Sequence, residues 1–169
     1  MTPSFRSVSL RFGSVAVWLV VAMPLSCAAA DFTGQVVNVH DGDTLTVLVD
    51  RNQVRVRLTD IDAPELGQAF GKRSKDSLAD ICAGKSAFVI WKSKDRYHRT
   101  LGRVSCANVD ANSEQVRRGM AWVYERYAPK NSPLYKVESR AREQGLGLWA
   151  DPWPVAPWEW RKGESRTSR

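Results

Sequence analysis

From residue 32 onward, apolar and polar residues alternate in short runs that are typical of β-strands. Residues 32–39 and 44–49 are rich in Val, Leu and Thr, and the turn signal Asp41-Gly42 lies between them. An Asp-Gly pair between two such runs is typical of a β-hairpin. The pattern therefore predicts that the two runs pair as antiparallel strands.

Three further runs are also expected to be strands. Residues 54–59 alternate apolar residues with arginines, in the order Val54, Arg55, Val56, Arg57 and Leu58. This period of two predicts a half-buried strand whose arginines both point away from the core. Residues 86–91 and 100–106 complete five predicted strands, and the polar turn DRYHR, residues 95–99, separates these last two.

Helical features appear in three segments. Residues 68–83 carry a patchy apolar stripe and are followed by Gly84, which suits the end of a helix. Residues 113–118 form a shorter candidate. The third helix is expected between Pro133 and Gly145, because proline suits the first turn of a helix and glycine suits its end.

Five short strands, one helix inserted after the third strand and helices at the end together predict an α+β fold. The order favours a five-stranded β-barrel of the oligonucleotide-binding type, with about three helices. We expect this domain to span residues 31–149 and a Trp- and Pro-rich basic tail to span residues 150–169. The part of the tail that carries Trp153, Trp158 and Trp160 is expected to fold back onto the domain, and its last eight residues are expected to be disordered.

The N-terminal residues 1–30 have the composition of a secretory signal peptide. Arg6 and Arg11 precede an apolar run at residues 15–23, and Ala28-Ala29-Ala30 offers a small-residue cleavage site before Asp31. A retained membrane helix is the alternative, but the run is shorter than the roughly 20 residues that span a bilayer. We expect a periplasmic or secreted protein, monomeric and without stable membrane association after cleavage.

The chain has a net charge of +7. A basic exported domain suits a polyanionic partner, although solubility alone would also explain the charge. Composition therefore permits nucleic acid as a partner and does not by itself select it.

Two of the three cysteines, Cys82 and Cys106, remain after signal cleavage. They lie at the end of a predicted helix and of a predicted strand, and exported proteins meet an oxidising compartment, so we expect a disulfide between them. Two buried thiols are the alternative. Zinc is disfavoured because neither cysteine has a histidine or a second cysteine at metal-ligand spacing. A lipid-anchored Cys27 is disfavoured because Pro24 stands where an aliphatic residue is expected.

Carboxylates and arginines gather at the edges of the predicted strands. Asp43 and Asp62 form a natural pair for a hard divalent cation, which prefers oxygen ligands. Glu65 follows on the same loop as Asp62 and could orient or deprotonate a water. Arg57 and Arg99 offer planar forks for phosphate oxygens. Taken singly, each residue could have a purely structural role, such as that of a turn former or a surface charge. The combination predicts cleavage of a phosphodiester.

The ordered motifs resemble those of the staphylococcal nuclease (thermonuclease) family. They are HDGDT (40–44), RLTDIDAPE (57–65), DRYHR (95–99) and ANSEQVRRGMAWVY (111–124), with a closing GLW (147–149). The resemblance runs from about residue 32 to residue 149. It implies a barrel fold and calcium-dependent cleavage of DNA and RNA that leaves 3'-phosphate ends, with Mg²⁺ and Mn²⁺ as alternative metals.

The resemblance also implies roles for individual residues. It makes Asp43 and Asp62 calcium ligands, with Ala63 offering a backbone carbonyl, and it places Asp41 beside the metal. It makes Glu65 the general base and Arg57 and Arg99 the phosphate-binding arginines. It places Tyr97 near the nucleotide phosphate.

The chain departs from the family pattern at two places. Glu125 falls where a base-stacking tyrosine is expected, and Tyr124 and Tyr127 flank it and could substitute. The loop after Glu65 is short, so its lysine contacts with the nucleotide could pass to Lys72 or Arg73. A catalytically weak, nuclease-like module that only binds nucleic acid is the alternative function. Retention of all five predicted site residues, namely Asp43, Arg57, Asp62, Glu65 and Arg99, favours the enzyme.

Overall fold

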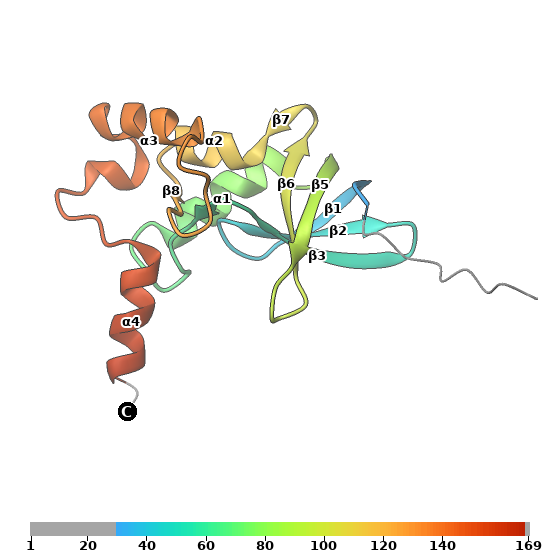
Figure 1. Cartoon of the computed structure of the whole chain (residues 1–169), viewed down its shortest axis with the longest axis horizontal. Coiled ribbons are helices and arrows are strands. Elements are labelled where there is room, and N and C mark those ends of the chain that lie inside the picture. Colours follow the sequence, from blue (N-terminus) through green and yellow to red (C-terminus); the bar gives the residue numbers. More distant parts are fainter. Residues whose placement is uncertain (1–29, 168–169) are drawn as a thin grey trace, which may run out of the picture.

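The structure is a computed structural model that describes residues 30–167 (Figure 1). Its elements follow in the order β1 (Phe32–Val39), β2 (Thr44–Val49), β3 (Asn52–Leu58), β4 (Ile61–Asp62), α1 (Gly71–Cys82), β5 (Ser86–Lys94), β6 (Thr100–Cys106), β7 (Val109–Asp110), α2 (Ala111–Arg117), β8 (Trp122–Val123), α3 (Leu134–Glu143), the 3₁₀ turn η1 (Gly147–Ala150) and α4 (Pro157–Thr167). The expected signal peptide lies outside the described residues except for Ala30 and stays a prediction.

Five strands close into the barrel that the sequence predicts, so the α+β fold class is confirmed. They are ordered β3-β2-β1-β5-β6, and a parallel pairing of β3 with β6 joins the two ends. The first part of β1 pairs with β5 and the second part pairs with β2, with a register shift between Val36 and Asn38. Such a shift bends a strand, which helps β1 to turn the corner between its neighbours.

Alternating side chains fill the interior of this barrel. In β3, Val56 and Leu58 are fully buried, while Arg55 between the strand's apolar positions is exposed. Leu45, Val47 and Val104 complete the same core. Each buried aliphatic side chain of this size contributes about 1.5 to 3 kcal/mol. The period of two in the sequence thus selects the correct inward-facing positions.

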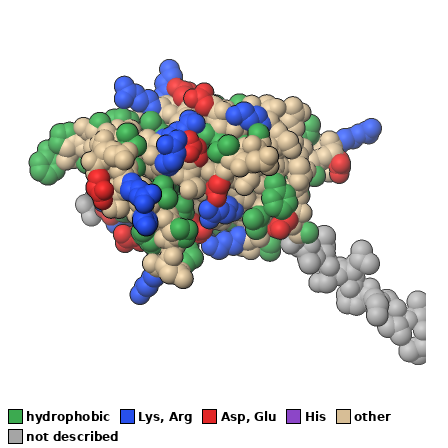
Figure 2. Space-filling view, turned by 90° about the horizontal axis from the view of Figure 1, so that it is seen from above, with side chains coloured by type: hydrophobic (Ala, Val, Ile, Leu, Met, Phe, Trp, Pro, Cys, Tyr) green, Lys and Arg blue, Asp and Glu red, His purple; other side chains and the backbone are tan. Residues whose placement is uncertain are grey.

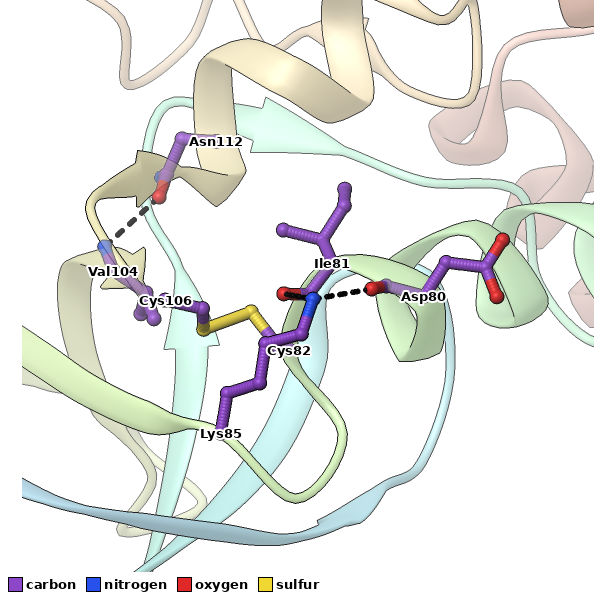
Figure 3. Close-up of a disulfide and its surroundings, with 7 residues drawn as sticks. All are labelled: Asp80, Ile81, Cys82, Lys85, Val104, Cys106 and Asn112. Atoms are coloured by element: carbon purple, nitrogen blue, oxygen red, sulfur yellow. Dashed lines mark hydrogen bonds between the residues drawn. A yellow bond between two sulfur atoms is a disulfide. The ribbon is translucent and has the colours of Figure 1, made fainter.

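Helices α1, α2 and α3 lie together at one side of the barrel, where α2 contacts both of the other two and β6 (Figure 1). A disulfide between Cys82 and Cys106 joins the last residue of α1 to the last residue of β6 (Figure 3). Beside it, Lys85 Nζ donates to the backbone oxygens of Asp80 and Ile81. The expected disulfide is therefore present, and it ties the first helix to the barrel.

The C-terminal tail differs from the expectation of disorder, because α4 continues to Thr167. Trp158 folds back and stacks on Tyr124, whereas Trp153 is 85% exposed. Strands β4, β7 and β8 have two residues each and are too short to produce a periodic signal in the sequence. Within residues 30–167, no helix combines the length and the hydropathy needed to cross a bilayer.

Candidate active site

The turn between β1 and β2 holds two aspartates in a fixed arrangement. The backbone N–H of Asp43 donates to Asp41 Oδ1 at 3.0 Å. Gly42 lies so close to α1 that an added Cβ would be 1.8 Å from Ser74 Oγ, so only glycine fits there. Gln115 Nε2 of α2 donates to the Gly42 carbonyl at 2.7 Å. Helices α1 and α2 thus position the turn that carries Asp43.

Asp43 is buried and each of its carboxylate oxygens accepts a hydrogen bond. Its Oδ2 accepts from the backbone N–H of Ala63 at 2.8 Å, and its Oδ1 accepts from Thr44 Oγ1 at 3.1 Å. The first of these bonds joins the β1–β2 turn to the loop that follows β3. Residues 20 positions apart in the chain therefore meet at one point.

Arg57 lies at the centre of this meeting point. Its Nη1 donates to the carbonyls of Leu58 and Ile61 at 2.8 and 3.1 Å. Its Nη2 lies 2.6 Å from Asp62 Oδ1 and 3.2 Å from Asp43 Oδ2. Burial opposes the charge, but Asp43 and Asp62 outweigh burial and raise the pKa of Arg57.

Arg55 and Arg57 alternate with the buried Val56 and Leu58 and point away from the barrel core, as predicted, but Arg57 is covered. Arg55 is exposed, but the Arg57 side chain is only 15% exposed. On the outside of the barrel, its guanidinium donates to the carbonyl of Leu58 at the end of β3 and to the carbonyl of Ile61 in β4. Strand periodicity cannot reveal this, because it distinguishes the two faces of a strand and does not show what covers the outer face.

Asp62 is held by a second arginine that sequence reasoning missed. Arg161 of α4 lies with Nη2 2.7 Å from Asp62 Oδ2 and with Nη1 2.6 Å from Glu65 Oε1. Burial raises the pKa of Asp62, and the guanidiniums of Arg161 and Arg57 oppose that rise. The carboxylates of Asp62 and Glu65 raise the pKa of Arg161, against the effect of its own burial. In the sequence, Arg161 is one more cation in a basic tail, and nothing local marks its distant partners.

Arg99 approaches from the loop between β5 and β6. Asp95 Oδ2 accepts from Arg99 Nε at 2.7 Å, while Asp95 Oδ1 accepts from the backbone N–H groups of Tyr97 and Arg99, both at 2.9 Å. Burial opposes the Asp95 charge, but these bonds outweigh it and lower the pKa of Asp95. The Arg99 guanidinium also lies 5.6 Å from the centre of the Tyr97 ring. Asp95 therefore positions Arg99. Like Arg161, Asp95 has a role at the site that the sequence did not reveal.

All these groups face one cavity of about 700 Å³. Its lining includes ten of the residues singled out in the sequence, namely Asp41, Asp43, Arg57, Asp62, Ala63, Glu65, Tyr97, Arg99, Tyr124 and Tyr127. Lys72 is exposed on α1 and is not part of this lining, so the structure does not bring it to the site. In Figure 1 the β5–β6 loop and α4 extend from the molecule in the same direction, and both contribute to the lining.

Aromatic side chains form one end of the cavity. Tyr124 and Tyr127 meet edge to face, with ring centres 5.0 Å apart. Trp158 of α4 lies parallel to Tyr124 at 5.3 Å and an interplanar angle of 8°. Tyr127 and Tyr97 are largely exposed, at 58% and 62%. The site thus offers aromatic rings beside a cluster of opposite charges, and one face of Tyr124 is covered by the tail.

The oxygen atoms around Arg57 fit a hard divalent cation. Asp43 and Asp62 converge on a single guanidinium nitrogen, and the burial of Asp41 together with its proximity to Asp43 raises the pKa of Asp41 to about 6. Carboxyls that repel one another gain from a nearby cation. Within residues 30–167, no three His, Cys, Asp or Glu side chains form a complete metal cage. A metal here would draw on Asp43, Asp62, the Ala63 carbonyl and water, a donor set that suits Ca²⁺ or Mg²⁺.

The surface beyond the cavity carries charges of both signs. On the face shown in Figure 2, Lys and Arg side chains are interspersed with Asp and Glu. Some surface charges pair locally: Glu114 of α2 pairs with Arg117 and with Arg118, the residue after the helix.

Comparison with known proteins agrees with the barrel fold and the sequence motifs. Residues 55–151 match the family model described as staphylococcal nuclease homologue. The chain is 44% identical to the micrococcal nuclease of Shigella flexneri, over 95% of this chain and 96% of that protein. It is 42% identical to an uncharacterized endonuclease of Haemophilus influenzae, over 86% of this chain and 82% of that protein. A staphylococcal-like nuclease of Arabidopsis thaliana is 38% identical over 65% of this chain and 34% of that protein. The barrel, the motifs and these matches together show that the chain belongs to the staphylococcal nuclease family.

Proposed function

We propose that this protein is a metal-dependent nuclease that hydrolyses phosphodiester bonds of DNA and RNA. The observation that carries the proposal is the convergence of three carboxylates and two arginines on one cavity: Asp43, Asp62, Glu65, Arg57 and Arg99. Phosphodiester hydrolysis needs positive charge at the phosphate, an activated water and alignment of the two. This set of residues supplies each requirement.

The arginines are suited to hold the phosphate. Arg57 is preorganised by two backbone carbonyls and two carboxylates, and Arg99 is oriented by Asp95. A guanidinium held in place stabilises the charge that develops on phosphate oxygens without having to reorganise during the reaction. A bound divalent cation would supply further charge neutralisation at the same phosphate.

Glu65 is the group that would activate the water. Its carboxylate lines the cavity, with a side chain that is 41% exposed and therefore accessible to solvent. Glu65 accepts a proton as the water oxygen bonds to phosphorus, the bond from phosphorus to the 5'-oxygen breaks, and the leaving oxygen takes a proton from solvent. The products are a 3'-phosphate and a 5'-hydroxyl, and this direction of cleavage rests on the family resemblance.

Calcium is the metal that we propose, with magnesium and manganese as alternatives. All the candidate ligands are oxygens, and calcium tolerates an irregular set of carboxylates, carbonyls and waters better than magnesium does. The proposal that both DNA and RNA are substrates also rests on the family resemblance. The proposed periplasmic or secreted location rests on the N-terminal sequence and on the disulfide, because disulfides persist in oxidising compartments.

The metal requirement is tested by digesting DNA and RNA with the purified protein. Separate reactions contain calcium, magnesium, manganese or a chelator, and the ends of the products are analysed. We expect cleavage with calcium, loss of cleavage with chelator and 3'-phosphate ends. Undiminished digestion in chelator would contradict a metal-dependent mechanism.

A nucleic-acid-binding module with weak catalysis is the second candidate. The observation in its favour is that Arg161 occupies both Asp62 and Glu65. Binding of DNA without cleavage under every metal condition would support this second candidate.

A further inference from the structure

The C-terminal segment is fastened to the active site by three separate contacts. Gln68 Nε2, on the loop before α1, donates to the Val155 carbonyl at 2.5 Å. Trp158 stacks on Tyr124, and Arg161 bridges Asp62 and Glu65. Two of these contacts involve side chains that line the active-site cavity. The segment is therefore part of the site and not a remote tail.

Arg161 lies where a metal cation would bind. Its guanidinium contacts both oxygens of Asp62, at 3.4 Å to Oδ1 and 2.7 Å to Oδ2, while Arg57 also holds Oδ1 at 2.6 Å. Both oxygens of this proposed metal ligand are thereby occupied. Arg161 also contacts the proposed base, because its Nη1 lies 2.6 Å from Glu65 Oε1.

Trp158 lies where the planar ring of a nucleobase would stack. Its indole lies parallel to Tyr124, one of the tyrosines expected to stack on a nucleobase. Aromatic side chains bind single-stranded nucleic acid through such stacking. While Trp158 covers Tyr124, a base cannot use that face of the ring.

We propose that α4 is an autoinhibitory segment that occupies the metal and nucleobase positions of the cavity and must move away before metal and nucleic acid bind together. This inference rests on the proposed nuclease function. Arg161 places a positive charge at the carboxylates, and three residues earlier Trp158 places an aromatic ring at Tyr124, so one turn of a helix imitates both features of a metal-bound nucleotide. A polyanionic substrate helps release α4, because its phosphates compete with the carboxylates for Arg161.

Competition of this kind is reciprocal. If α4 and the metal exclude each other at Asp62, metal binding must compete with the docking of α4. Any change that weakens this docking therefore raises the affinity for the metal. Loss of Arg161 has this effect directly. Loss of Trp158 has the same effect only if α4 leaves as a unit, since the indole contact recorded here is with Tyr124 and not with the carboxylates.

The test is calcium binding measured by isothermal titration calorimetry without nucleic acid. The proteins are the wild type, Arg161→Ala, Trp158→Ala and the control Arg140→Ala, whose arginine is exposed on α3 and away from the cavity lining. We expect Arg161→Ala and Trp158→Ala each to lower the calcium Kd about five- to tenfold, with Arg140→Ala unchanged. Arg161→Gln, which keeps much of the side chain, serves as a second variant, and circular dichroism confirms that each variant is folded.

Digestion rates provide an independent check. At calcium concentrations below saturation, Arg161→Ala is expected to cleave faster than the wild type, and the difference is expected to narrow as calcium and DNA approach saturation. Slower cleavage by Arg161→Ala at saturation would show instead that Arg161 contributes to catalysis, and it would overturn the proposal.

The remaining outcomes separate this inference from the proposed function. Equal calcium affinity in all the variants would overturn autoinhibition and leave the metal-dependent nuclease intact. Tighter binding in Arg161→Ala alone would overturn the claim that α4 acts as a unit. Absence of calcium, magnesium and manganese binding in every protein, including Arg161→Ala, would overturn both proposals.

Discussion

Asp62 is paired with two arginines that are far apart in the sequence. Arg57 belongs to β3 and Arg161 belongs to α4, and the Asp62 side chain between them is 1% exposed. A buried carboxylate that lost both partners would be strongly destabilising. The two guanidiniums therefore offset part of the effect of burial, which raises the pKa of Asp62.

The candidate residues were predictable from sequence where a motif carries them. HDGDT and RLTDIDAPE carry the two aspartates and Glu65, and the structure brings the two motifs together through the bond from the Ala63 N–H to Asp43. Asp95 and Arg161 were not predicted as site residues. Asp95 acts through hydrogen bonds to Arg99, and Arg161 acts across a sequence separation of 99 residues from Asp62, so no local spacing connects them to the chemistry.

Arg99→Ala tests the role of a single preorganised charge. Removal of one such donor costs about 3 to 4 kcal/mol of transition-state stabilisation, so we expect kcat to fall by about 10² to 10³. The loss should lie mainly in kcat, measured by steady-state digestion of DNA, with Arg140→Ala as a control. A change confined to KM would show that Arg99 binds substrate without stabilising the transition state.

At the scale of elements, the strands were easier to predict than the C-terminal segment. Alternation in β3 and the Asp-Gly turn before β2 are local signals, and both are confirmed. Closure of β3 onto β6 was predicted only through the order of elements, because the pairing itself is non-local. Helix α4 lacks a strong apolar stripe, and its docking depends on Arg161 and Trp158, which contact partners elsewhere in the fold.

The disulfide between α1 and β6 is expected to stabilise the fold. Joining residues 24 positions apart restricts the unfolded chain, and the loop-entropy model gives about 3 to 4 kcal/mol for a loop of this size. The double variant Cys82→Ala/Cys106→Ala should therefore lose about that much unfolding free energy in urea denaturation. Unfolding free energies equal within error would show that the bridge contributes little.

Helix α2 carries a pH-dependent contribution to stability. Hydrogen bonds from Arg117, together with those from Arg118, lower the pKa of Glu114 from an ordinary 4.5 to about 2. Because the folded-state pKa is the lower one, the contribution is complete above about pH 4.5 and is lost as the pH falls toward 2.

Glu114→Gln measures this contribution. The variant should be less stable than the wild type at pH 7, by about 1 kcal/mol because solvent screens these partly exposed pairs. Thermal denaturation should show the gap closing as the pH approaches 2. Glu143→Gln, at an exposed position on α3, is the control. A gap that is constant from pH 7 to pH 2 would contradict the assignment.

The whole molecule combines a rigid barrel with a cavity formed at its periphery. The barrel and the helices fix Asp43, Arg57 and Asp62, while the β5–β6 loop brings Arg99 and α4 brings Arg161. Loops and terminal segments can move at less cost than packed strands. The residues proposed to hold the metal are thus fixed next to the barrel, whereas Arg99 and Arg161 come from a loop and from the C-terminal helix.

The rate of DNA cleavage by Glu65→Gln is the decisive measurement, because Glu65 is the residue assigned to activate the water. Glutamine keeps the size of the side chain but cannot accept the proton. With calcium saturating, kcat should fall by about 10² to 10⁴ relative to the wild type, while Glu143→Gln should match the wild type. Cleavage by Glu65→Gln at the wild-type rate would contradict its role as general base and the mechanism built on it.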